Sequence, residues 1–442
     1  MQKRKESVLV GAISEILSAY HYSPVVLDDA FSEKCFKLYI EHLDFNKIYL
    51  LQSDINVLET YKYKIDDEIK DKTFNFFDLS VEVIEKRIEE TTLLYQEMLQ
   101  SPFDYTVVEQ IELNEEKINY PIDKNAQKEM WRKTLKYHTL DKIVDSYNTQ
   151  LENKKKSDTV VLKSFEELEK EARAYVLKKF DNRFKRIEKL NSEDRLSVYV
   201  NTITGCFDPH TSYLPPNDKE DFDISISGKL EGIGATLSVK DEYIKVVNIV
   251  PGSASWRQGE LETEDLILKV GQGDSEPVDV VGMRLDEAVQ LIRGPKGSKV
   301  VLTVKKIDGS IKLIPIIRDV VMLEETFAKS TILSSKDNSK KIGYIYLPKF
   351  YVDFENAKGR RCAVDIKAEL IKLNTEKVDG IIFDLRNNGG GSLADVVQIG
   401  GYFIEKGPIV QVKSKMFAPA IKEDSDPSIV YNIYLYYISN FI

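Results

Sequence analysis

Three consecutive glycines are the most distinctive feature of this sequence that could take part in chemistry. Gly389, Gly390 and Gly391 follow an apolar segment, 380–386, and precede an expected helix that begins at Leu393. Glycines ahead of a helix N-terminus let successive backbone N–H groups face an anion, as they do in phosphate-binding loops. No Gly-Lys-Ser/Thr sequence follows, and the G-x-G-x-x-G spacing is absent, so neither a nucleoside-triphosphate loop nor a dinucleotide fingerprint is indicated.

A second glycine-rich segment, Leu-Glu-Gly-Ile-Gly-Ala, occupies residues 230–235 in the middle of the chain. It places Gly232 and Gly234 on either side of Ile233. Glycines in this arrangement let backbone N–H groups turn toward a terminal carboxylate, while the peptide that carries the carboxylate adds as a strand to a sheet edge. Taken alone, a Gly-x-Gly sequence most often forms only a tight turn.

The remaining candidate residues do not form a metal site or a nucleophile motif. The four histidines, His21, His42, His138 and His210, lack H-x-x-x-H and H-E-x-x-H spacing, so we expect neither a metal nor a cofactor. We expect His210 to brace its loop through a hydrogen bond rather than to act as a general base. Ser392 follows the glycines but lies in no G-x-S-x-G elbow, so we do not expect it to be a nucleophile.

Length and charge exclude several classes of protein. The chain has 442 residues, enough for about three domains of about 150 residues each. It carries 62 basic and 72 acidic residues, and the formal charge of −10 disfavours nucleic-acid binding. No apolar run approaches the ~18 residues of a membrane helix. The basic start, 1–7, is followed by an apolar stretch that Ser14, Glu15 and Ser18 interrupt, so no signal peptide is visible.

The three cysteines, Cys35, Cys206 and Cys362, are widely spaced and include no C-x-x-C pair. This spacing indicates neither a zinc ribbon nor a disulfide framework. We expect three isolated, buried thiols. The cysteines therefore do not identify the compartment.

Glycine usage divides the chain near residue 220. Only two of the 22 glycines lie before that point, and the other 20 lie between 228 and 407. Glycine costs about 1 kcal/mol in a helix interior, so the first part is expected to be helical. Apolar residues at helical spacing predict helices over 7–19 and 81–98. A further helix should begin after Ser164, which forms a capping box with Glu167.

The later parts combine strands with helices. Short β-rich runs and one helix are expected in the middle part, at 232–239, 244–250, 265–270, 285–292 (the helix) and 300–304. From 321 onward, strands at 342–347 and 380–386 flank an expected helix over 353–374. The second of these strands is continuously apolar, as strands in buried parallel sheets are.

The middle part resembles a PDZ domain over about 100 residues. The motifs that carry the resemblance are the 230–235 segment, Ile249–Ser255, Leu266–Val270 and the 285–292 helix. The resemblance implies a peptide site in which the backbone of the 230–235 segment binds a free carboxyl terminus. The residues implied in this site are Leu230, Gly232, Ile233, Gly234 and Ala235, with the side chains of Leu230 and Ile233 against the apolar end of the peptide.

Four further segments extend the resemblance to nearly the whole chain. They are Leu43–Ile55, Asp208–Leu214, Gly294–Ser298 and Phe383–Leu393. With them the chain resembles the tail-specific, or C-terminal processing, serine peptidases of the long, Prc-like branch. The resemblance implies a multidomain α+β protein. Its expected parts are an α-helical N-terminal domain (1–220, its end at 200–220 joining the core), a PDZ domain (221–320) and an incomplete α/β, ClpP/crotonase-like protease core (321–442).

The resemblance also implies a chemistry. In this family a serine attacks the peptide carbonyl, a lysine with a lowered pKa takes its proton, and backbone N–H groups hold the oxyanion. Gly390 matches the position of an oxyanion donor. Asp384, Arg386, Gly389 and Gly391 are expected to support the loop rather than to react.

The sequence departs from the family at the catalytic residues themselves. It contains neither the Ser-Ala-Ser-Ala-Ser-Glu-like motif of the nucleophile nor the lysine that follows it, and residues 431–442 do not match the expected strand. We interpret this tail as a truncation or frameshift product rather than as the edge strand of a shorter protein. The 442-residue chain should then be inactive alone.

An alternative function is that of a non-catalytic peptide-binding or scaffold protein built around the PDZ domain. Either function implies partners with free apolar C-termini, and the family resemblance adds a possible adaptor protein and a periplasmic location. A reading frame that continues into the serine and lysine motifs would favour the enzyme.

Overall fold

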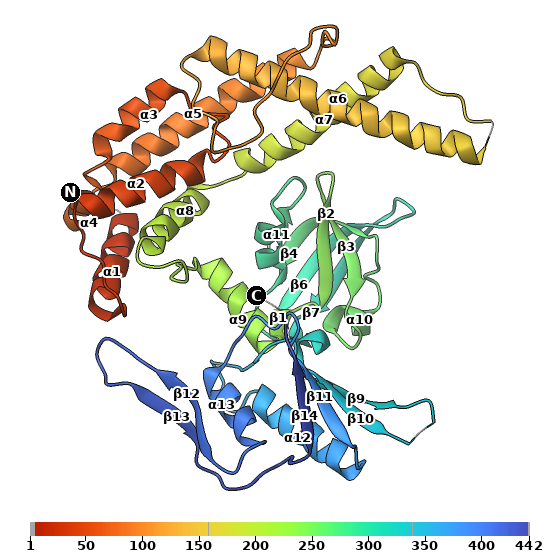
Figure 1. Ribbon diagram of the computed structural model, residues 1–442. Helices are drawn as coiled ribbons and strands as arrows, with labels where there is room; N and C mark the ends of the chain where they lie inside the picture. Colours follow the sequence, from red (N-terminus) through yellow and green to blue (C-terminus); the bar gives the residue numbers. More distant parts are fainter. Residues whose placement is uncertain (1–4, 158, 338, 441–442) are drawn as a thin grey trace. The chain divides into compact units, whose positions relative to one another are not determined.

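The computed structural model describes residues 5–157, 159–337 and 339–440. The chain divides into two compact units. The first comprises Met1–Pro215 with Ser414–Met416, and the second comprises Pro216–Lys413 with Phe417–Ile442. Figure 1 shows that the first unit is helical, whereas the second contains all the labelled strands.

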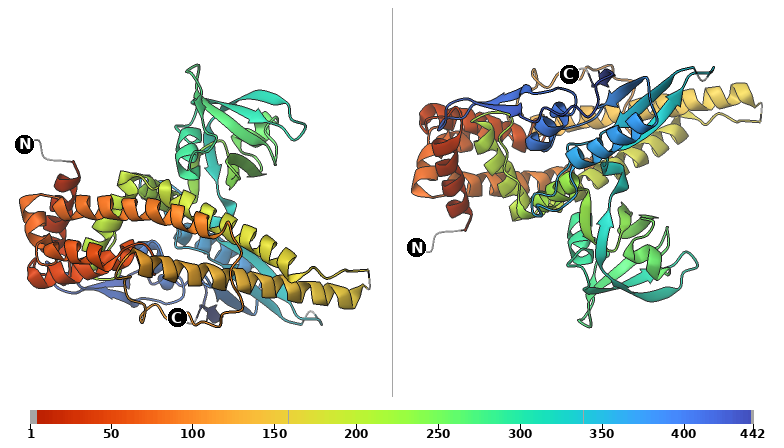
Figure 2. Two further views of the ribbon diagram at one scale, coloured as in Figure 1. Left: turned by 90° about the horizontal axis from the view of Figure 1, so that it is seen from above. Right: turned by 90° about the horizontal axis from the view of Figure 1, so that it is seen from below.

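The first unit consists of helices, as the scarcity of glycine predicts. Ser164 accepts the N–H of Glu167, whose carboxylate accepts the N–H of Ser164, so the expected capping box is present. The long helices α6 and α7 lie side by side (Figures 1 and 2). The elements are α1 (Lys5–Tyr20), α2 (Asp29–Leu43), α3 (Gln52–Leu58), η1 (Glu59–Tyr61), α4 (Ile65–Asp71), α5 (Asn75–Met98), α6 (Lys124–Lys156), α7 (Phe165–Glu188) and α8 (Ser192–Gly205).

Aromatic side chains dominate the core of the first unit. Tyr39 of α2 and Tyr199 of α8 are fully buried, and their ring centroids lie 5.0 Å apart. Tyr95 and Phe184 join α5 to α7 with a centroid separation of 4.7 Å. Burial of a large apolar side chain contributes about 1.5–3 kcal/mol, so these pairs fix how the helices pack.

The segment between α2 and α3 is organised by two carboxylates. Asp44 accepts the backbone N–H groups of Ile48, Tyr49 and Leu50. Asp54 accepts the N–H of Leu51 at the start of α3. This segment is part of the Leu43–Ile55 motif, and its conformation follows from these bonds.

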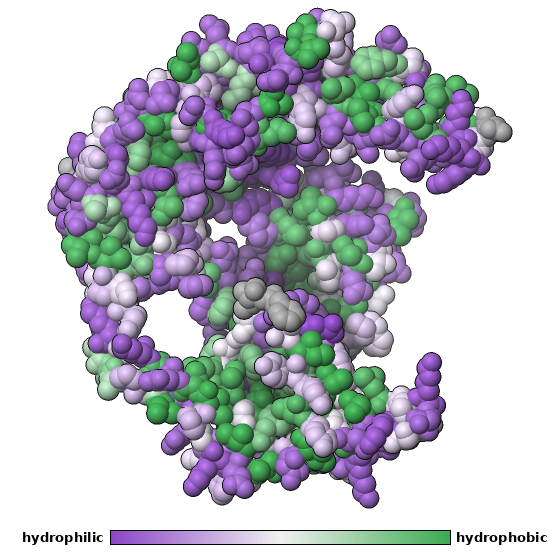
Figure 3. Space-filling view, in the orientation of Figure 1, coloured by the Kyte–Doolittle hydropathy of each residue, from purple (hydrophilic) through white to green (hydrophobic). Residues whose placement is uncertain are grey.

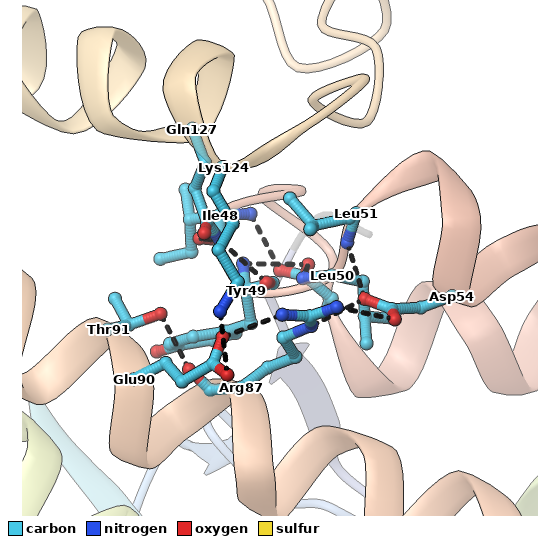
Figure 4. A network of polar contacts seen from close by, with 11 residues as sticks. Ile48, Tyr49, Leu50, Leu51, Asp54, Arg87, Glu90, Thr91, Lys124 and Gln127 are labelled. Atoms are coloured by element: carbon cyan, nitrogen blue, oxygen red, sulfur yellow. Dashed lines mark hydrogen bonds and ion pairs between the residues drawn. The ribbon is translucent and has the colours of Figure 1, made fainter.

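Arg87 of α5 ties the same segment to the helix bundle. Its guanidinium binds both carboxylate oxygens of Asp54, at 2.7 and 2.8 Å (Figure 4). It also donates to Glu90, which accepts from Lys124 of α6. Because the Arg87–Asp54 pair is nearly buried and bidentate, loss of either partner would leave an uncompensated charge.

The three cysteines are buried thiols, as the sequence predicts. All three thiols are free. Cys35 of α2 and Cys206 at the end of α8 lie in the same buried core, because these two helices pack against each other. Cys362 lies in the buried core of the second unit.

The second unit begins with a helix and a six-stranded sheet. The sheet has the order β2-β3-β4-β6-β7, with β5 paired to β4, and a separate antiparallel pair joins β1 to β8. The sheet residues Ile244, Ile267 and Leu302 are fully buried together with Ala288 of α11. The elements are α9 (Pro216–Ser227), β1 (Lys229–Gly232), β2 (Ala235–Lys240), β3 (Tyr243–Ile249), α10 (Ala254–Gln258), β4 (Leu266–Gln272), β5 (Val278–Asp279), α11 (Leu285–Ile292), β6 (Lys299–Lys305), β7 (Ile311–Ile317) and β8 (Asp319–Met322).

The rest of the second unit contains a four-stranded sheet with the order β14-β11-β10-β9. The predicted strand at 380–386 is present as β11, parallel to β10. Ile366 and Leu370 of α12 share a buried core with Ile345 and Ile381 of the sheet. The elements are η2 (Glu324–Thr326), β9 (Lys329–Ser334), β10 (Lys341–Tyr346), α12 (Cys362–Thr375), β11 (Gly380–Asp384), α13 (Leu393–Gly401), β12 (Gly407–Val412), β13 (Ala420–Asp424) and β14 (Tyr434–Ile438).

The helix predicted over 353–374 begins later than expected, at Cys362. The carboxylate of Asp353 accepts the N–H groups of Glu355 and Asn356 and so stabilises a turn at the predicted start. Local side-chain bonds of this kind compete with helix formation. The helix therefore starts only after Gly359 and the two arginines that follow it.

The C-terminal segment forms a strand, which corrects the expectation of an unmatched tail. β14 pairs in parallel with β11, from Tyr434 opposite Gly380 to Ile438 opposite Asp384. Its uncharged, aromatic and β-branched residues favour this conformation. Tyr434 is 72% exposed at the sheet edge. Phe441 and Ile442 lie outside the described residues.

Candidate functional site

The 230–235 segment forms a tight turn from β1 into the edge of the six-stranded sheet. Gly234 has φ +78°, and a Cβ atom added there would lie 2.1 Å from Cβ of Ser253. The hydroxyl of Ser253 and the N–H of Val250 both donate to the carbonyl of Gly234. The N–H of Ser255 donates to the carbonyl of Ile233. The carbonyl groups of the turn are therefore held inside the protein.

Two backbone N–H groups of the same turn are unpaired among the described residues. Within the described parts of the chain, the N–H groups of Ile233 and Gly234 donate to no carbonyl or side chain. Among the described strands, the adjoining strand β2 pairs with β3 alone, so its other edge is open there. α11 packs beside β2, with Leu285 and Val289 half-buried. Two free N–H groups beside an open strand edge can receive the carboxylate and backbone of a peptide.

The structure places the two expected side-chain contacts elsewhere. Ile233 is 3% exposed and packs in the core with Ile244 and Ile292, so its side chain is not open to a peptide, contrary to expectation. The left-handed backbone at Gly234 turns the residue before it inward. Leu230 lines a hollow of about 550 Å³ with Ile224 of α9 and residues 352–355.

Gly232 and Ala235 complete the predicted peptide site at the two ends of the turn. Gly232 ends β1 opposite Asp319, and a Cβ atom there would lie 3.3 Å from the side chain of Leu230. Ala235 begins β2 opposite Ile249. Both residues therefore frame the turn through their backbone.

The triple-glycine loop connects β11 to α13 and is held by the Phe350 backbone. Phe350 donates its N–H to the carbonyl of Gly390 and accepts the N–H of Ser392. A Cβ atom at Gly391 would lie 2.2 Å from the Phe350 oxygen, and φ there is +143°. Only glycine permits this close approach.

Gly390, the expected oxyanion donor, makes a hydrogen bond inside its own loop. Its N–H donates to Oδ1 of Asn388 at 2.8 Å, while Nδ2 of Asn388 donates to the carbonyl of Leu347. Among the described residues, the N–H groups of Gly389 and Gly391 have no acceptor. An anion could reach these two groups directly, but at Gly390 it would have to displace the Asn388 side chain.

Asp384 and Arg386 form a charged pair at the start of the loop. The Arg386 guanidinium donates to both carboxylate oxygens of Asp384, and the backbone N–H of Arg386 donates as well. The Tyr344 hydroxyl is a further donor. The Arg386 guanidinium holds the pKa of the buried Asp384 carboxyl well below its usual range.

Ser392 serves as the helix cap of α13. Its hydroxyl donates to Asp395 and accepts the N–H of that residue. The carboxylate of Asp395 in turn binds the Arg361 guanidinium at 2.9 Å. No histidine or lysine contacts Ser392 among the described residues, so nothing here would activate it as a nucleophile.

The loop around His210 is braced by its neighbours instead of by its ring. Asp208 accepts the backbone N–H groups of His210 and Thr211 and pairs with Nε2 of His21. The His210 ring itself is exposed. The expectation that His210 is the bracing side chain is therefore wrong, because Asp208 performs that role. Among the described residues, no cluster of His, Cys, Asp and Glu suits a metal ion.

Three family models match the chain in consecutive order. The Tail specific protease N-terminal domain matches residues 13–217, the PDZ domain matches 223–305 and Peptidase family S41 matches 341–436. The tail-specific protease of Haemophilus influenzae is 34% identical over 427 residues, which cover 96% of this chain and 57% of that protein. The chain belongs to the tail-specific protease family. The S41 match includes residues 431–436, which we had expected to depart from the family.

Further relatives are C-terminal processing proteases. The carboxy-terminal processing protease CtpA of Bacillus subtilis is 34% identical over 252 residues, covering 54% of this chain and 48% of that protein. The solved PDZ domain of the carboxy-terminal protease of Vibrio cholerae, in complex with peptide, is 44% identical. It covers 22% of this chain and 99% of that chain, with a TM-score of 0.21. The chain thus spans about half the length of the two curated relatives.

Proposed function

We propose that the protein is a serine-type C-terminal processing peptidase that captures unstructured substrate C-termini at its PDZ segment. The single observation that carries this proposal is the pair of unpaired N–H groups at Ile233 and Gly234, beside the open edge of β2. A free carboxylate accepts from two such groups, and an apolar last residue would lie between β2 and α11.

A binding comparison tests this proposal. A fluorescein-labelled, unstructured peptide that ends in valine with a free carboxylate is titrated with the full chain and followed by fluorescence anisotropy. The same peptide with an amidated C-terminus is the matched control. A hydrogen bond to a charged group contributes about 1.5–3 kcal/mol, so amidation should weaken binding by about ten- to hundredfold. Equal affinities for the two peptides would contradict the proposal.

We further propose that peptide cleavage in this family member uses a serine and a lysine together with the loop of Gly389, Gly390 and Gly391. In this proposal the N–H of Gly390 acts as an oxyanion donor once its hydrogen bond to Asn388 is broken. The printed sequence contains no family-type serine motif, so we expect no hydrolysis by residues 1–442 alone. Incubation with a denatured, alkylated protein, followed by mass spectrometry, should yield no new peptides. Sustained turnover that Ser392→Ala abolishes would contradict this assignment.

A non-catalytic peptide-binding or scaffold role is the second candidate, because the unpaired N–H groups beside the open edge of β2 would serve it equally well. Such a protein would show the same preference for a free carboxylate with no cleavage in any longer form of the chain. Family membership also supports a periplasmic location and an adaptor protein as partner. Fractionation of cells that produce the native gene product would test the location. No helix in the described ranges is both long and apolar enough to cross a membrane.

A further inference from the structure

Arg318, between β7 and β8, is a buried cation whose hydrogen-bond acceptors are all uncharged. Its side chain belongs to a residue that is 2% exposed. The guanidinium donates to the carbonyl groups of Leu291 and Ile292, the hydroxyl of Ser298 and Oε1 of Gln272. Among the described residues, no carboxylate forms an ion pair with Arg318.

Retaining such a charge in the interior is unfavourable. An ion loses its hydration on burial, so buried charges in proteins are normally paired with an opposite charge. The next residue follows this rule, because Asp319 pairs with Arg257 at 2.6 Å and with Lys296 at 3.0 Å. The positive charge of Arg318 is therefore available to act on an anion that comes from outside the described chain.

Arg318 lies close to the turn that carries the two unpaired N–H groups. The residue after it, Asp319, pairs directly opposite Gly232 of the turn. A Cβ atom on Gly294 would lie 3.0 Å from Nε of Arg318, and the N–H of Gly294 donates to the carbonyl of Glu231. With standard backbone dimensions, these contacts put the guanidinium roughly 10 Å from the unpaired N–H groups.

The guanidinium also covers the C-terminal end of α11, which is next to the same turn. The cap residue of α11, Arg293, has its Cα atom 3.8 Å from a Cβ atom placed on Gly232. The last carbonyl groups of a helix carry a partial negative charge. Arg318 binds those of Leu291 and Ile292 at 3.0 and 2.9 Å. Without the guanidinium, the negative end of α11 would repel a carboxylate that approaches the turn.

We propose that Arg318 is a positioning residue that strengthens the preference of the candidate peptide site for a free carboxylate. This inference rests on the function proposed above. The buried guanidinium does not touch the peptide. Instead, its charge offsets the negative end of α11 and attracts the carboxylate that the two N–H groups bind. Because the guanidinium is buried, mobile ions screen its charge less than they screen an exposed charge.

The size of the effect follows from Coulomb's law. Two unit charges roughly 10 Å apart, at an effective dielectric constant of about 20–40, attract each other enough to change a dissociation constant about four- to fifteenfold. An amidated peptide has no terminal charge, so its affinity should not depend on this attraction. The ratio of the two affinities, free acid over amide, therefore separates the effect of the charge from the effect of packing.

Two pairs of variants test the inference in the full chain, with the labelled valine-ended peptide and its amidated form as probes. Arg318→Gln removes the charge, and Arg318→Lys keeps it. Gln272→Glu replaces an acceptor 2.7 Å from Nη2 of Arg318 by a carboxylate, and Gln272→Ala removes the same acceptor without adding a charge. Gln272 is exposed, so its variants should fold even where Arg318→Gln does not.

We expect Arg318→Gln and Gln272→Glu to lower the acid-to-amide affinity ratio about four- to fifteenfold. Arg318→Lys and Gln272→Ala should leave the ratio close to that of the unsubstituted chain. A purely structural role would weaken the binding of both peptides alike, so an unchanged ratio in Gln272→Glu would overturn this inference alone. Equal binding of the two peptides by the unsubstituted chain would contradict the proposed function as well.

Discussion

Replacing Gly234 by alanine tests whether the backbone of the candidate carboxylate site requires glycine. An L-residue in the left-handed region costs about 1–2 kcal/mol. The new methyl group would lie 2.1 Å from Cβ and 2.5 Å from Oγ of Ser253. Ser253 is buried and bonded to the Gly234 carbonyl, so it cannot move freely, and the overlap adds about 1–3 kcal/mol. The total loss of stability should be about 2–5 kcal/mol.

Hydrogen exchange of the full chain, resolved by mass spectrometry, measures this loss locally. Peptides that cover β3, the partner of β2, should exchange at least about thirtyfold faster in Gly234→Ala than in the unsubstituted protein, because each 1.4 kcal/mol is about a factor of ten. Peptides from α5, in the first unit, serve as the internal reference.

Gly252→Ala is the matched control. Gly252 has a similar φ of +77°, but a Cβ atom there would meet nothing within 4 Å. The two variants therefore share the free-energy cost of an L-residue in left-handed backbone and differ in the contact with Ser253. This contact should make peptides from β3 exchange about five- to 150-fold faster in Gly234→Ala than in Gly252→Ala. Equal exchange rates in the two variants would refute the reasoning.

Three further predictions concern the rest of the chain. Arg87→Ala leaves the nearly buried Asp54 carboxylate without its partner, so the free energy of unfolding in urea should fall by about 3–5 kcal/mol. The matched control is Lys124→Ala, whose side chain is 67% exposed and whose loss should lower the free energy of unfolding by less than about 1 kcal/mol. Similar losses in the two variants would contradict the role of burial. Ser392→Ala removes the cap of α13 and should lower stability by about 1 kcal/mol in calorimetry, and no change would argue against a capping role. Burial raises the pKa of Asp44 to about 6, above its value of about 4 in the unfolded chain. The folded state therefore binds this proton more tightly than the unfolded state does. The contribution of Asp44 to the free energy of unfolding should consequently grow as the pH falls from 7 to 4. Urea unfolding at a series of pH values should show that the stability of Asp44→Asn lacks this pH-dependent contribution. Identical pH profiles of stability in Asp44→Asn and the unsubstituted protein would contradict the prediction.

The elements that the sequence predicted are those that depend on local pattern. The Ser164 capping box and the β11 strand each follow from residues adjacent in the sequence, and both are present. The same holds for the tight turn that the glycine spacing of the 230–235 segment indicated, in which Gly234 has a positive φ.

The features that the sequence did not predict depend on contacts between distant residues. Ile233 is buried because β2 and α11 pack around it, and β14 forms because β11 offers an open edge. Cys35 and Cys206 likewise enter one core only once α2 and α8 pack together. No local pattern encodes the hydrogen bond by which Asn388 occupies the N–H of Gly390.

The most direct test of the central claim observes the two N–H groups themselves. The full chain is labelled with nitrogen-15 at glycine and isoleucine, and the amide resonances of Gly234 and Ile233 are assigned by substitution at each position. Addition of a valine-ended peptide with a free carboxylate should shift both resonances downfield, as expected for a new hydrogen bond to a charged acceptor. The amidated peptide should leave them in place. Binding of the free-acid peptide with no shift of either resonance would contradict the account.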